Sequence, residues 1–236
     1  MGCRCIRVYK YARHIVTKLT KLSFSERNAG MAIRAVVFDV GGVLETTPDT
    51  GMTEKWEERL HLKPGELDER LRSAGWDRDG TLGKRSEEEL QKSLGEITGM
   101  DQTQVDAFMH DLWEEYLGEL NVELAAYFSS LRPRYQTALL CNSFVGARSR
   151  EQERYHFDEM TDLIIYSHEE GIAKPERRIF ELTCERLGVQ PEEIIFLDDF
   201  EPNVAAAREF GIRAILFRET SQAIADIQAC LQAHAS

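Results

Sequence analysis

Short apolar runs alternate with amphipathic segments along most of the chain. Five runs of four or five residues are rich in β-branched or aromatic side chains and apolar on both faces, at 35–39, 137–141, 163–166, 193–197 and 213–217. Such runs are typical of strands buried in a parallel sheet. Strands that alternate with helices pack as a parallel sheet with helices on both faces. The pattern therefore predicts the α/β class, with a Rossmann-like three-layer α/β/α core.

Two of the predicted helices carry clear start and stop signals. Pro175 precedes a helical segment that ends near Gly188, and Pro202 precedes another that ends at Gly211. Proline fits the first turn of a helix because the amide hydrogen that it lacks has no partner there, and glycine fits the position just after the last turn. These signals place one helix before and one helix after the fourth predicted strand.

The alternation stops between about residues 47 and 118, where only helical spacing is found. Met52, Trp56 and Leu60 recur every four residues, and Ser86 with Glu89 forms a capping-box pattern at the start of another amphipathic segment. We expect residues 47–118 to form an all-helical cap subdomain inserted after the first core strand. Residues 31–46 and 119–236 would then form the core.

The first thirty residues differ from the rest of the chain. Val8, Ile15 and Leu19 recur at roughly helical spacing with lysines and arginines between them. A basic amphipathic helix can lie on an anionic membrane surface or serve as a targeting segment. The start resembles a myristoylation signal, but Ile6 stands where that pattern requires Ser or Thr. We expect residues 1–30 to be a basic N-terminal extension without a fold of its own.

Composition sets the broad class of the protein. Of the 236 residues, 42% are hydrophobic and 30% are charged, as in ordinary globular proteins. No apolar run approaches the ~20 residues that a membrane span requires, so we expect no membrane span. The five cysteines are scattered without CxxC pairs, which argues against a disulfide framework and against a zinc ribbon. We therefore expect a reducing, cytoplasmic setting, and the sequence leaves the oligomeric state open.

Charge is distributed unevenly along the chain. The formal net charge is -12 at pH 7, yet residues 1–30 hold seven basic residues and one acidic residue. The remaining 206 residues hold 22 basic and 40 acidic groups. A body this acidic repels nucleic-acid phosphates and attracts multivalent cations. We therefore expect no nucleic-acid partner.

Candidate chemistry gathers at the ends of the predicted strands. In an open parallel sheet, ligands and catalytic groups lie at the carboxyl ends of the strands. The residues that end these runs or follow them are Asp39 with Gly41, Asn142 with Ser143, Lys174, and Asp198 with Asp199.

These four motifs, in this order and at this spacing, resemble those of the haloacid dehalogenase-like hydrolase superfamily, in its phosphatase branch with a helical cap. The resemblance covers about residues 33–220. It implies a Mg²⁺-dependent phosphatase that hydrolyses a small phosphorylated metabolite through an aspartyl-phosphate intermediate. The metabolite is the one partner that it implies.

The resemblance also implies a metal site. Asp39 would be the nucleophile. Asp39, Asp199 and the backbone carbonyl of Gly41 would hold Mg²⁺, and Asp198 would bind a water of that metal. Without the resemblance, Asp39 could simply follow a strand as a loop residue, and Asp198 with Asp199 could stabilise the start of a helix through its dipole.

The remaining motif residues are implied to act on the phosphate. Lys174 would balance the carboxylates and bind the phosphoryl group, and it counts as catalytic for that reason. Asn142 and Ser143 would offer hydrogen-bond donors to the same group. Without the resemblance, Lys174 is an ordinary surface lysine, and Asn203 is as well suited to tying a loop as to binding a ligand.

Two positions depart from the family's pattern. The family usually places a second aspartate two positions after the nucleophile, as general acid and base, and this chain has Gly41 there. The family also has Ser or Thr where this chain has Cys141, and a thiol is a poor hydrogen-bond donor. Both departures favour an alternative, in which a catalytically impaired family member binds a phosphometabolite or a protein partner.

A second enzymatic alternative is dehalogenation of a 2-haloacid, which uses the same nucleophile without a metal. The pair Asp198 and Asp199 argues against it, because adjacent carboxylates facing Asp39 repel one another in the absence of a cation. The sequence does not name the substrate. Cap side chains that could contact it include Trp76, Asp77, Arg78 and Lys84, and nothing in the sequence ranks them.

Overall fold

A five-stranded parallel sheet forms the centre of the computed structural model, which describes residues 32–48 and 50–234. The strands lie in the order β5-β4-β1-β6-β7. Their bounds are β1 Ala35–Phe38, β4 Gln136–Cys141, β5 Leu163–Tyr166, β6 Ile194–Asp198 and β7 Arg213–Leu216. Each predicted strand is present to within one residue at either end.

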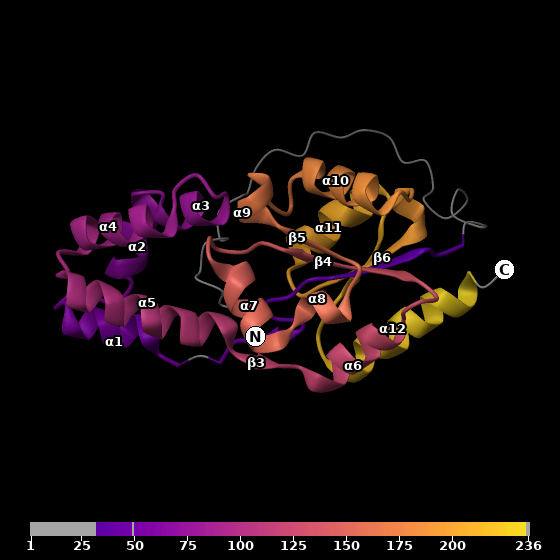
Figure 1. The fold of residues 1–236 in the computed structure, drawn as a ribbon, viewed down its shortest axis with the longest axis horizontal. Helices are drawn as coiled ribbons and strands as arrows, with labels where there is room; N and C mark the ends of the chain where they lie inside the picture. The colour runs from indigo at the N-terminus through magenta and orange to yellow at the C-terminus, as the bar shows by residue number, and fades with distance from the viewer. Residues whose placement is uncertain (1–31, 49, 235–236) are drawn as a thin grey trace.

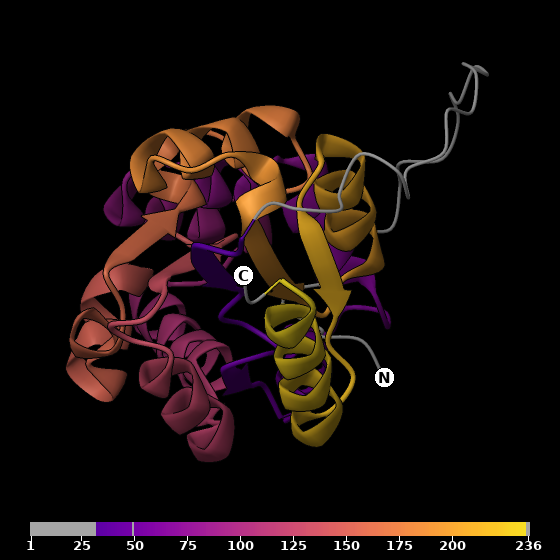
Figure 2. The same cartoon turned by 90° about the vertical axis from the view of Figure 1, so that its right-hand side faces the viewer.

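Helices cover both faces of this sheet, as Figures 1 and 2 show. Helices α6 (Val122–Ser130) and α12 (Thr220–Ala233) pack on one face, and α10 (Arg177–Leu187) and α11 (Glu201–Phe210) pack on the other. The core also contains α7 Ala147–Tyr155, α8 Phe157–Met160, α9 Ser167–Glu170 and the 3-10 turn η1 Pro191–Glu193. The three-layer α/β/α core predicted from the sequence is confirmed.

Strand β1 is the middle strand and is buried on both faces. Val36 and Phe38 point into the apolar cluster under α6 and α12, whereas Ala35 and Val37 point into the cluster under α10 and α11. The Phe38 ring stacks on that of Phe128 in α6, with ring centroids 4.5 Å apart. This packing makes the carboxyl end of β1 a rigid platform.

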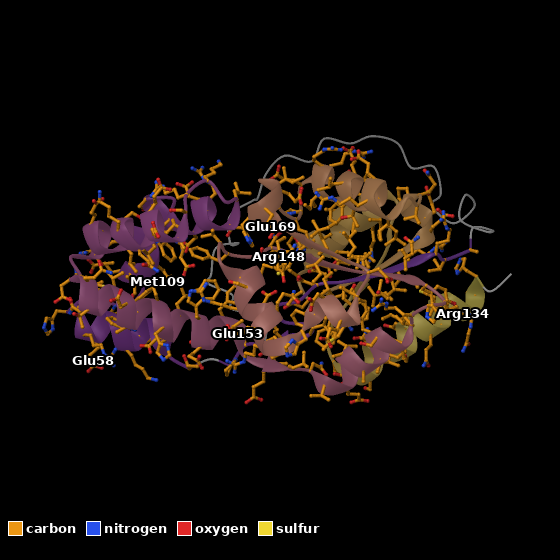
Figure 3. All side chains as sticks on the ribbon, in the orientation of Figure 1. Glu58, Met109, Arg134, Arg148, Glu153 and Glu169 are labelled. Atoms are coloured by element: carbon orange, nitrogen blue, oxygen red, sulfur yellow. The ribbon has the colours of Figure 1, made fainter. Side chains whose placement is uncertain are left out.

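The segment between β2 (Glu45–Thr46) and β3 (Glu119–Leu120) is helical. These two short strands pair antiparallel and lie at the limits predicted for the cap, residues 47–118. The helices are α1 Met52–Arg59, α2 Glu66–Ser73, α3 Trp76–Thr81, α4 Glu87–Thr98 and α5 Gln102–Leu117. They enclose an apolar cluster that also includes Phe144 and Ala147 of the core, and Met109 lies between the helices (Figure 3). The predicted capping box of Ser86 and Glu89 begins α4.

The cap is docked on the core through an aromatic contact and an ion pair. Trp76 in α3 packs on Phe144, which follows β4, with ring centroids 4.9 Å apart. Gly80 permits this close approach, since a Cβ there would lie 2.0 Å from the Phe144 ring. Arg150 in α7 binds Glu87 at the start of α4, with Nη2 2.8 Å from Oε1. These contacts fix α3 above the end of β4.

The predicted N-terminal extension, residues 1–30, lies outside the described residues. In the part of the chain that is described, no helix has both the length and the apolarity needed to cross a membrane.

Candidate active site

The carboxyl ends of three neighbouring strands bring the predicted residues to one edge of the sheet. Asp39 directly follows β1, Asn142 follows β4, and Asp198 ends β6. The amide of Asp39 donates to the carbonyl of Leu197 at 2.8 Å, so the pairing of β1 with β6 extends to this edge. The connections run outward from β1 to β4 and β5, then cross to β6 on the other side of β1 and continue to β7. Because the direction of the connections changes beside β1, the strand ends form a crevice there.

Lys174 lies between two of the carboxylates. Its Nζ is 2.7 Å from Oδ1 of Asp39 and 2.8 Å from Oδ2 of Asp198, and its side chain is fully buried. Burial by itself lowers the pKa of Lys174, but the carboxylates of Asp198 and Asp39 outweigh it and hold this pKa above its ordinary value. Lys174 is therefore a buried, permanently charged cation, and the alternative of an ordinary surface lysine is wrong.

Asn142 and Ser143 form hydrogen bonds within the chain. The amide group of Asn142 donates to the carbonyl of Lys174 and accepts from its backbone N–H, both at 2.8 Å. The hydroxyl of Ser143 lies 2.7 Å from Nδ1 of His168, and its amide donates to Oγ of Ser167 at 2.9 Å. We expected both side chains to donate to a phosphate. The bonds within the chain fix the loop of Lys174 and the start of α9, and the donation to a phosphate stays a prediction.

Helix α9 is held in turn by an ion pair with α7. Arg148 and Glu169 point toward one another in Figure 3, with Nε 2.6 Å from Oε1 and Nη2 2.7 Å from Oε2. This bidentate geometry is the strong form of the arginine–carboxylate ion pair. Burial lowers the pKa of the neighbouring His168. His168 therefore supports Ser143 as a neutral ring near neutral pH.

Asp198 is completely buried and held by several donors. Its Oδ1 accepts from the amide of Phe200 at 2.8 Å, and Nδ2 of Asn203 lies 3.2 Å and 3.1 Å from its two oxygens. Lys174 binds its Oδ2. Asn203, in the first turn of α11, is thus a tie for Asp198, which decides between the two roles left open by the sequence.

One carboxylate oxygen of Asp39 is held by neighbouring groups, and the other is open, meaning that it accepts no hydrogen bond from the described residues. Its Oδ1 accepts from the amide of Val40 at 2.8 Å and from Lys174. Its Oδ2 accepts no hydrogen bond from residues 32–48 or 50–234. Burial raises the pKa of Asp39, Lys174 lowers it, and Asp198 and Asp199 raise it further, so the pKa lies well above its ordinary value. The open oxygen belongs to a carboxylate that needs additional positive charge.

The carboxylates fit a divalent cation. Asp39, Asp198 and Asp199 offer oxygens that lie within 4.8 Å of one another. Three ionised carboxylates and Lys174 sum to a formal charge of -2, and carboxylate oxygens are the ligands that Mg²⁺ prefers. Oδ1 of Asn203 is buried and accepts no hydrogen bond from the described residues, so a water bound to a metal here would find an acceptor. The donor set is consistent with magnesium.

Gly41 lies in a tight turn that leads from β1 to β2. The carbonyl of Val40 accepts from the amides of Leu44 and Glu45 at 2.8 Å and 2.9 Å, and the amide of Gly42 donates to the carbonyl of Glu45 at 2.7 Å. This turn carries no acidic side chain at position 41. A proton donor for a leaving group must therefore come from another residue or from solvent.

Cys141 is an inert part of the site. It ends β4 and is buried, and burial raises the pKa of its thiol, with further increases from Glu151 and Asp39. A thiol held protonated in this way is a poor nucleophile and resists oxidation. The redox sensitivity that a cysteine here could suggest is not supported by its surroundings.

A cavity of about 1070 Å³ separates the cap from this edge of the sheet. Gly42 and Asp199 line it from the core, and Trp76 and Asp77 line it from the cap. The structure distinguishes the cap side chains that line this cavity from those that do not. Arg78 is 69% exposed and pairs with Asp79, and Lys84 is exposed and does not line the cavity.

Asp77 is buried without a counter-ion. Its side chain lies in the first turn of α3, the residue is 3% exposed, and its Oδ1 accepts no hydrogen bond from the described residues. Burial raises the pKa of Asp77 to about 7, Asp68 raises it as well, and Arg72 lowers it. Sequence reasoning could not find this, because nothing around Asp77 distinguishes it from the neighbouring cap acids.

Replacing Asp77 with asparagine should stabilise the protein at high pH relative to low pH. An acid whose pKa rises from 3.8 in the unfolded chain to about 7 in the fold loses stability as pH rises between those values. The gain in unfolding free energy of the variant over wild type should therefore grow from pH 4 to pH 7, by up to about 4 kcal/mol, and then level off.

Urea titrations across this pH range measure the effect. Asp106 is exposed in α5, and Asp106→Asn provides the control. If the unfolding free energies of wild type and Asp77→Asn differ by the same amount at every pH from 4 to 8, burial does not raise the pKa of Asp77.

The chain is similar to several known proteins. The family model for haloacid dehalogenase-like hydrolases matches residues 33–211. Among curated proteins, the chain is 30% identical to the mouse acyl-CoA dehydrogenase family member 10 over 86% of its own length, but it spans only 20% of that protein. It is 26% identical to the D-ribitol-5-phosphate phosphatase of Bacteroides thetaiotaomicron, over 76% of this chain and 89% of that protein.

Solved structures share the fold. A haloacid dehalogenase family enzyme from Bacteroides thetaiotaomicron, in complex with magnesium and inorganic phosphate, superposes with a TM-score of 0.67. The match covers 79% of this chain and 95% of that one at 23% identity. At this identity the similarity establishes the fold alone.

Proposed function

The chain belongs to the haloacid dehalogenase-like hydrolase family, and from this premise we propose that it is a magnesium-dependent phosphatase. The reaction would release inorganic phosphate from a small phosphorylated metabolite through an aspartyl-phosphate intermediate. The observation that carries the proposal is the arrangement at the end of β1, where Asp39 has an open oxygen and its other oxygen is held by the buried Lys174.

Asp39 is the proposed nucleophile. Its Oδ1 is fixed by the amide of Val40 and by Lys174, so the carboxylate cannot rotate freely and Oδ2 is left to react. In the first step, Oδ2 bonds to phosphorus while the bond from phosphorus to the ester oxygen breaks, and the departing oxygen takes a proton from solvent. In the second step, a water oxygen bonds to phosphorus, the bond to Asp39 breaks, and the water's proton passes to solvent.

Lys174 and Asn142 prepare the site for a phosphate. Lys174 offsets the negative charge of Asp39 and Asp198 and places a fixed positive charge beside the phosphoryl group, without reorganisation during the reaction. Asn142 is a positioning residue, because its side-chain amide donates to the carbonyl of Lys174 and accepts from its backbone N–H. Ser143 acts less directly, because its hydroxyl bonds to His168.

Asp39, Asp199 and the carbonyl of Gly41 are the proposed magnesium ligands, with Asp198 holding a water of the metal. When bound, the cation would neutralise the charge that the carboxylates and the phosphate bring together. The net charge of the cluster and the raised pKa of Asp39 support this assignment, since both favour the entry of a divalent cation.

The relatives support a phosphomonoester as substrate. The relative from Bacteroides thetaiotaomicron bears the name of a phosphatase of ribitol 5-phosphate, and the superposed structure contains magnesium with phosphate. The free thiols of Cys141, Cys184 and Cys230 support the proposal that the protein works in a reducing, cytoplasmic setting.

Gly41 favours one alternative, a family member that binds a phosphometabolite or a protein partner without turning it over. The family's proton donor is missing at that position, and a positioned general acid is typically worth ~10²–10⁴-fold in rate. The open oxygen of Asp39 favours catalysis, because a binding site for phosphate needs no such group.

Assays of a panel of phosphorylated metabolites with and without Mg²⁺ test the proposal. We expect phosphate release with Mg²⁺ and a loss of at least about a hundredfold in excess chelator, because the carboxylates and the substrate phosphate otherwise repel one another. Mg²⁺ should also raise the melting temperature by mass action. Full activity in excess chelator would contradict the metal site. Tight binding of phosphate analogues without any turnover would establish the non-catalytic alternative.

A further inference from the structure

Asp77 has no role within the chain that explains its burial. It does not cap α3, whose N-cap is Gly75, and it forms no ion pair with any described residue. Asp79 lies only two residues away and is bound by Arg85 at 2.9 Å. A buried carboxyl without a counter-ion reduces stability, so the fold would gain from a neutral or apolar residue at this position.

The location of Asp77 supplies a role. It lines the cap side of the cavity whose core side is lined by Asp199 and Gly42, next to the proposed nucleophile. A phosphoryl group that reacts with Asp39 must direct the rest of the substrate away from the sheet, and the cavity is the space on that side. The leaving group would therefore lie between the edge of the sheet and the wall that carries Asp77.

The charge of the cavity limits what that leaving group can be. Its lining includes six carboxyl residues and a single basic one, Arg218. A leaving group with a second negative charge would be repelled by this lining, whereas a neutral or cationic group would not. A hydroxyl or an ammonium group can donate to the buried carboxyl, and rotation about Cβ–Cγ lets either oxygen of Asp77 accept that bond.

We infer that Asp77 binds a hydrogen-bond donor, a hydroxyl or an ammonium group, on the leaving group of the substrate, and that the cavity rejects anionic leaving groups. The inference rests on the proposed phosphatase function and adds the chemistry of the substrate beyond the phosphate. The raised pKa of Asp77 supports it, because the buried carboxyl lacks a counter-ion in the fold and a donor on the substrate would be its partner.

Matched substrates test this inference. Sets of short linear alkyl monophosphates, each set at one chain length, would end in a methyl, hydroxyl, ammonium or carboxylate group. At the chain length that reaches Asp77, kcat/KM in the wild type should be highest for hydroxyl or ammonium and lowest for carboxylate. In Asp77→Leu the preference for the donor over methyl should fall roughly 10–100-fold, the usual loss for a buried hydrogen bond that involves a charged group.

A second variant separates the two donors. Asp77→Asn keeps an acceptor without the charge, so it should retain a preference for hydroxyl and lose a preference for ammonium. The ratio of kcat/KM between substrates is the quantity compared, so a general loss of folded enzyme cancels. Asp106→Asn, exposed in the same cap, is the control and should keep the wild-type ratios.

The failure of this inference differs from the failure of the proposed function. Para-nitrophenyl phosphate needs no contact with Asp77, and its hydrolysis by the wild type shows that the phosphatase works. Equal terminal-group ratios in wild type and Asp77→Leu at every chain length, with para-nitrophenyl phosphate still hydrolysed, would overturn the role of Asp77. A wild-type preference for carboxylate would overturn the charge argument.

Discussion

Replacing Asp39 with asparagine should reduce kcat for a phosphomonoester by at least about four orders of magnitude. An amide oxygen is a weak nucleophile, and Oδ2 of Asp39 is the open carboxylate oxygen of the site. The fold should survive, because the substitution removes a buried carboxylate whose pKa is raised by burial. Steady-state kinetics at saturating Mg²⁺, together with the melting temperature, measure both effects.

The matched control is again Asp106→Asn, which changes one exposed carboxylate of the cap in the same way and should leave kcat within about twofold. Activity of Asp39→Asn within about tenfold of wild type would remove Asp39 from the role of nucleophile. Loss of the folded state in Asp39→Asn would instead show that the carboxylate is needed for structure.

Replacing Lys174 with methionine should lower the free energy of unfolding by about 3–5 kcal/mol and abolish activity. The substitution keeps an unbranched side chain, shorter by the terminal nitrogen, and leaves Asp39 and Asp198 buried, 2.7 Å and 2.8 Å from where their shared cation had been. Their mutual repulsion and the loss of a buried ion pair act in the same direction. Urea denaturation in the absence of divalent cations measures the change.

A double variant separates charge from packing. Adding Asp198→Asn to Lys174→Met removes one of the two buried carboxylates that lost their counter-ion. The loss of unfolding free energy in the double variant should therefore be smaller than the sum of the losses in the two single variants. Lys84→Met, in an exposed position of the cap, is the control and should change stability by less than about 0.5 kcal/mol. A similar small effect for Lys174→Met would contradict the buried cluster.

The sheet and its edge could be predicted because their signals are local. Runs of four or five residues that are apolar on both faces and rich in β-branched or aromatic residues are typical of buried strands. Residues at their ends meet because parallel strands end at one edge. That logic brought Asp39 and Asp198 together from positions 159 residues apart by sequence number. It also placed Lys174 correctly, although its full burial between the two carboxylates depends on packing that the sequence does not display.

Partners that face one another across loops could not be predicted. Nothing in the sequence indicates that the side-chain amide of Asn142 bonds to the backbone of Lys174, 32 residues later in the chain. Ser143 likewise bonds to His168, 25 residues later in the chain. A strand-end polar residue has many geometrically possible partners, and hydrogen-bonding capacity alone does not choose among them.

The role of Asp77 was hidden for a related reason. In sequence it is one acid among several in the cap, beside Arg78 and Asp79. Only the docking of Trp76 on Phe144 turns this side of α3 toward the core and buries Asp77 at the cavity. Burial of a helix residue depends on which face its neighbours cover, and in a short helix the periodicity is too brief to show it.

Trapping the phosphorylated enzyme tests the central claim most directly. Wild-type protein mixed with a ³²P-labelled phosphomonoester and Mg²⁺ would be quenched in acid within the first turnover, treated with borohydride and digested. The account predicts acid-stable label on the protein and conversion of Asp39 to homoserine, because borohydride reduces an aspartyl-phosphate and leaves a free carboxylate unchanged. Asp39→Asn should show neither. Hydrolysis of the substrate by the wild type with no label at Asp39 at any quench time would contradict the account.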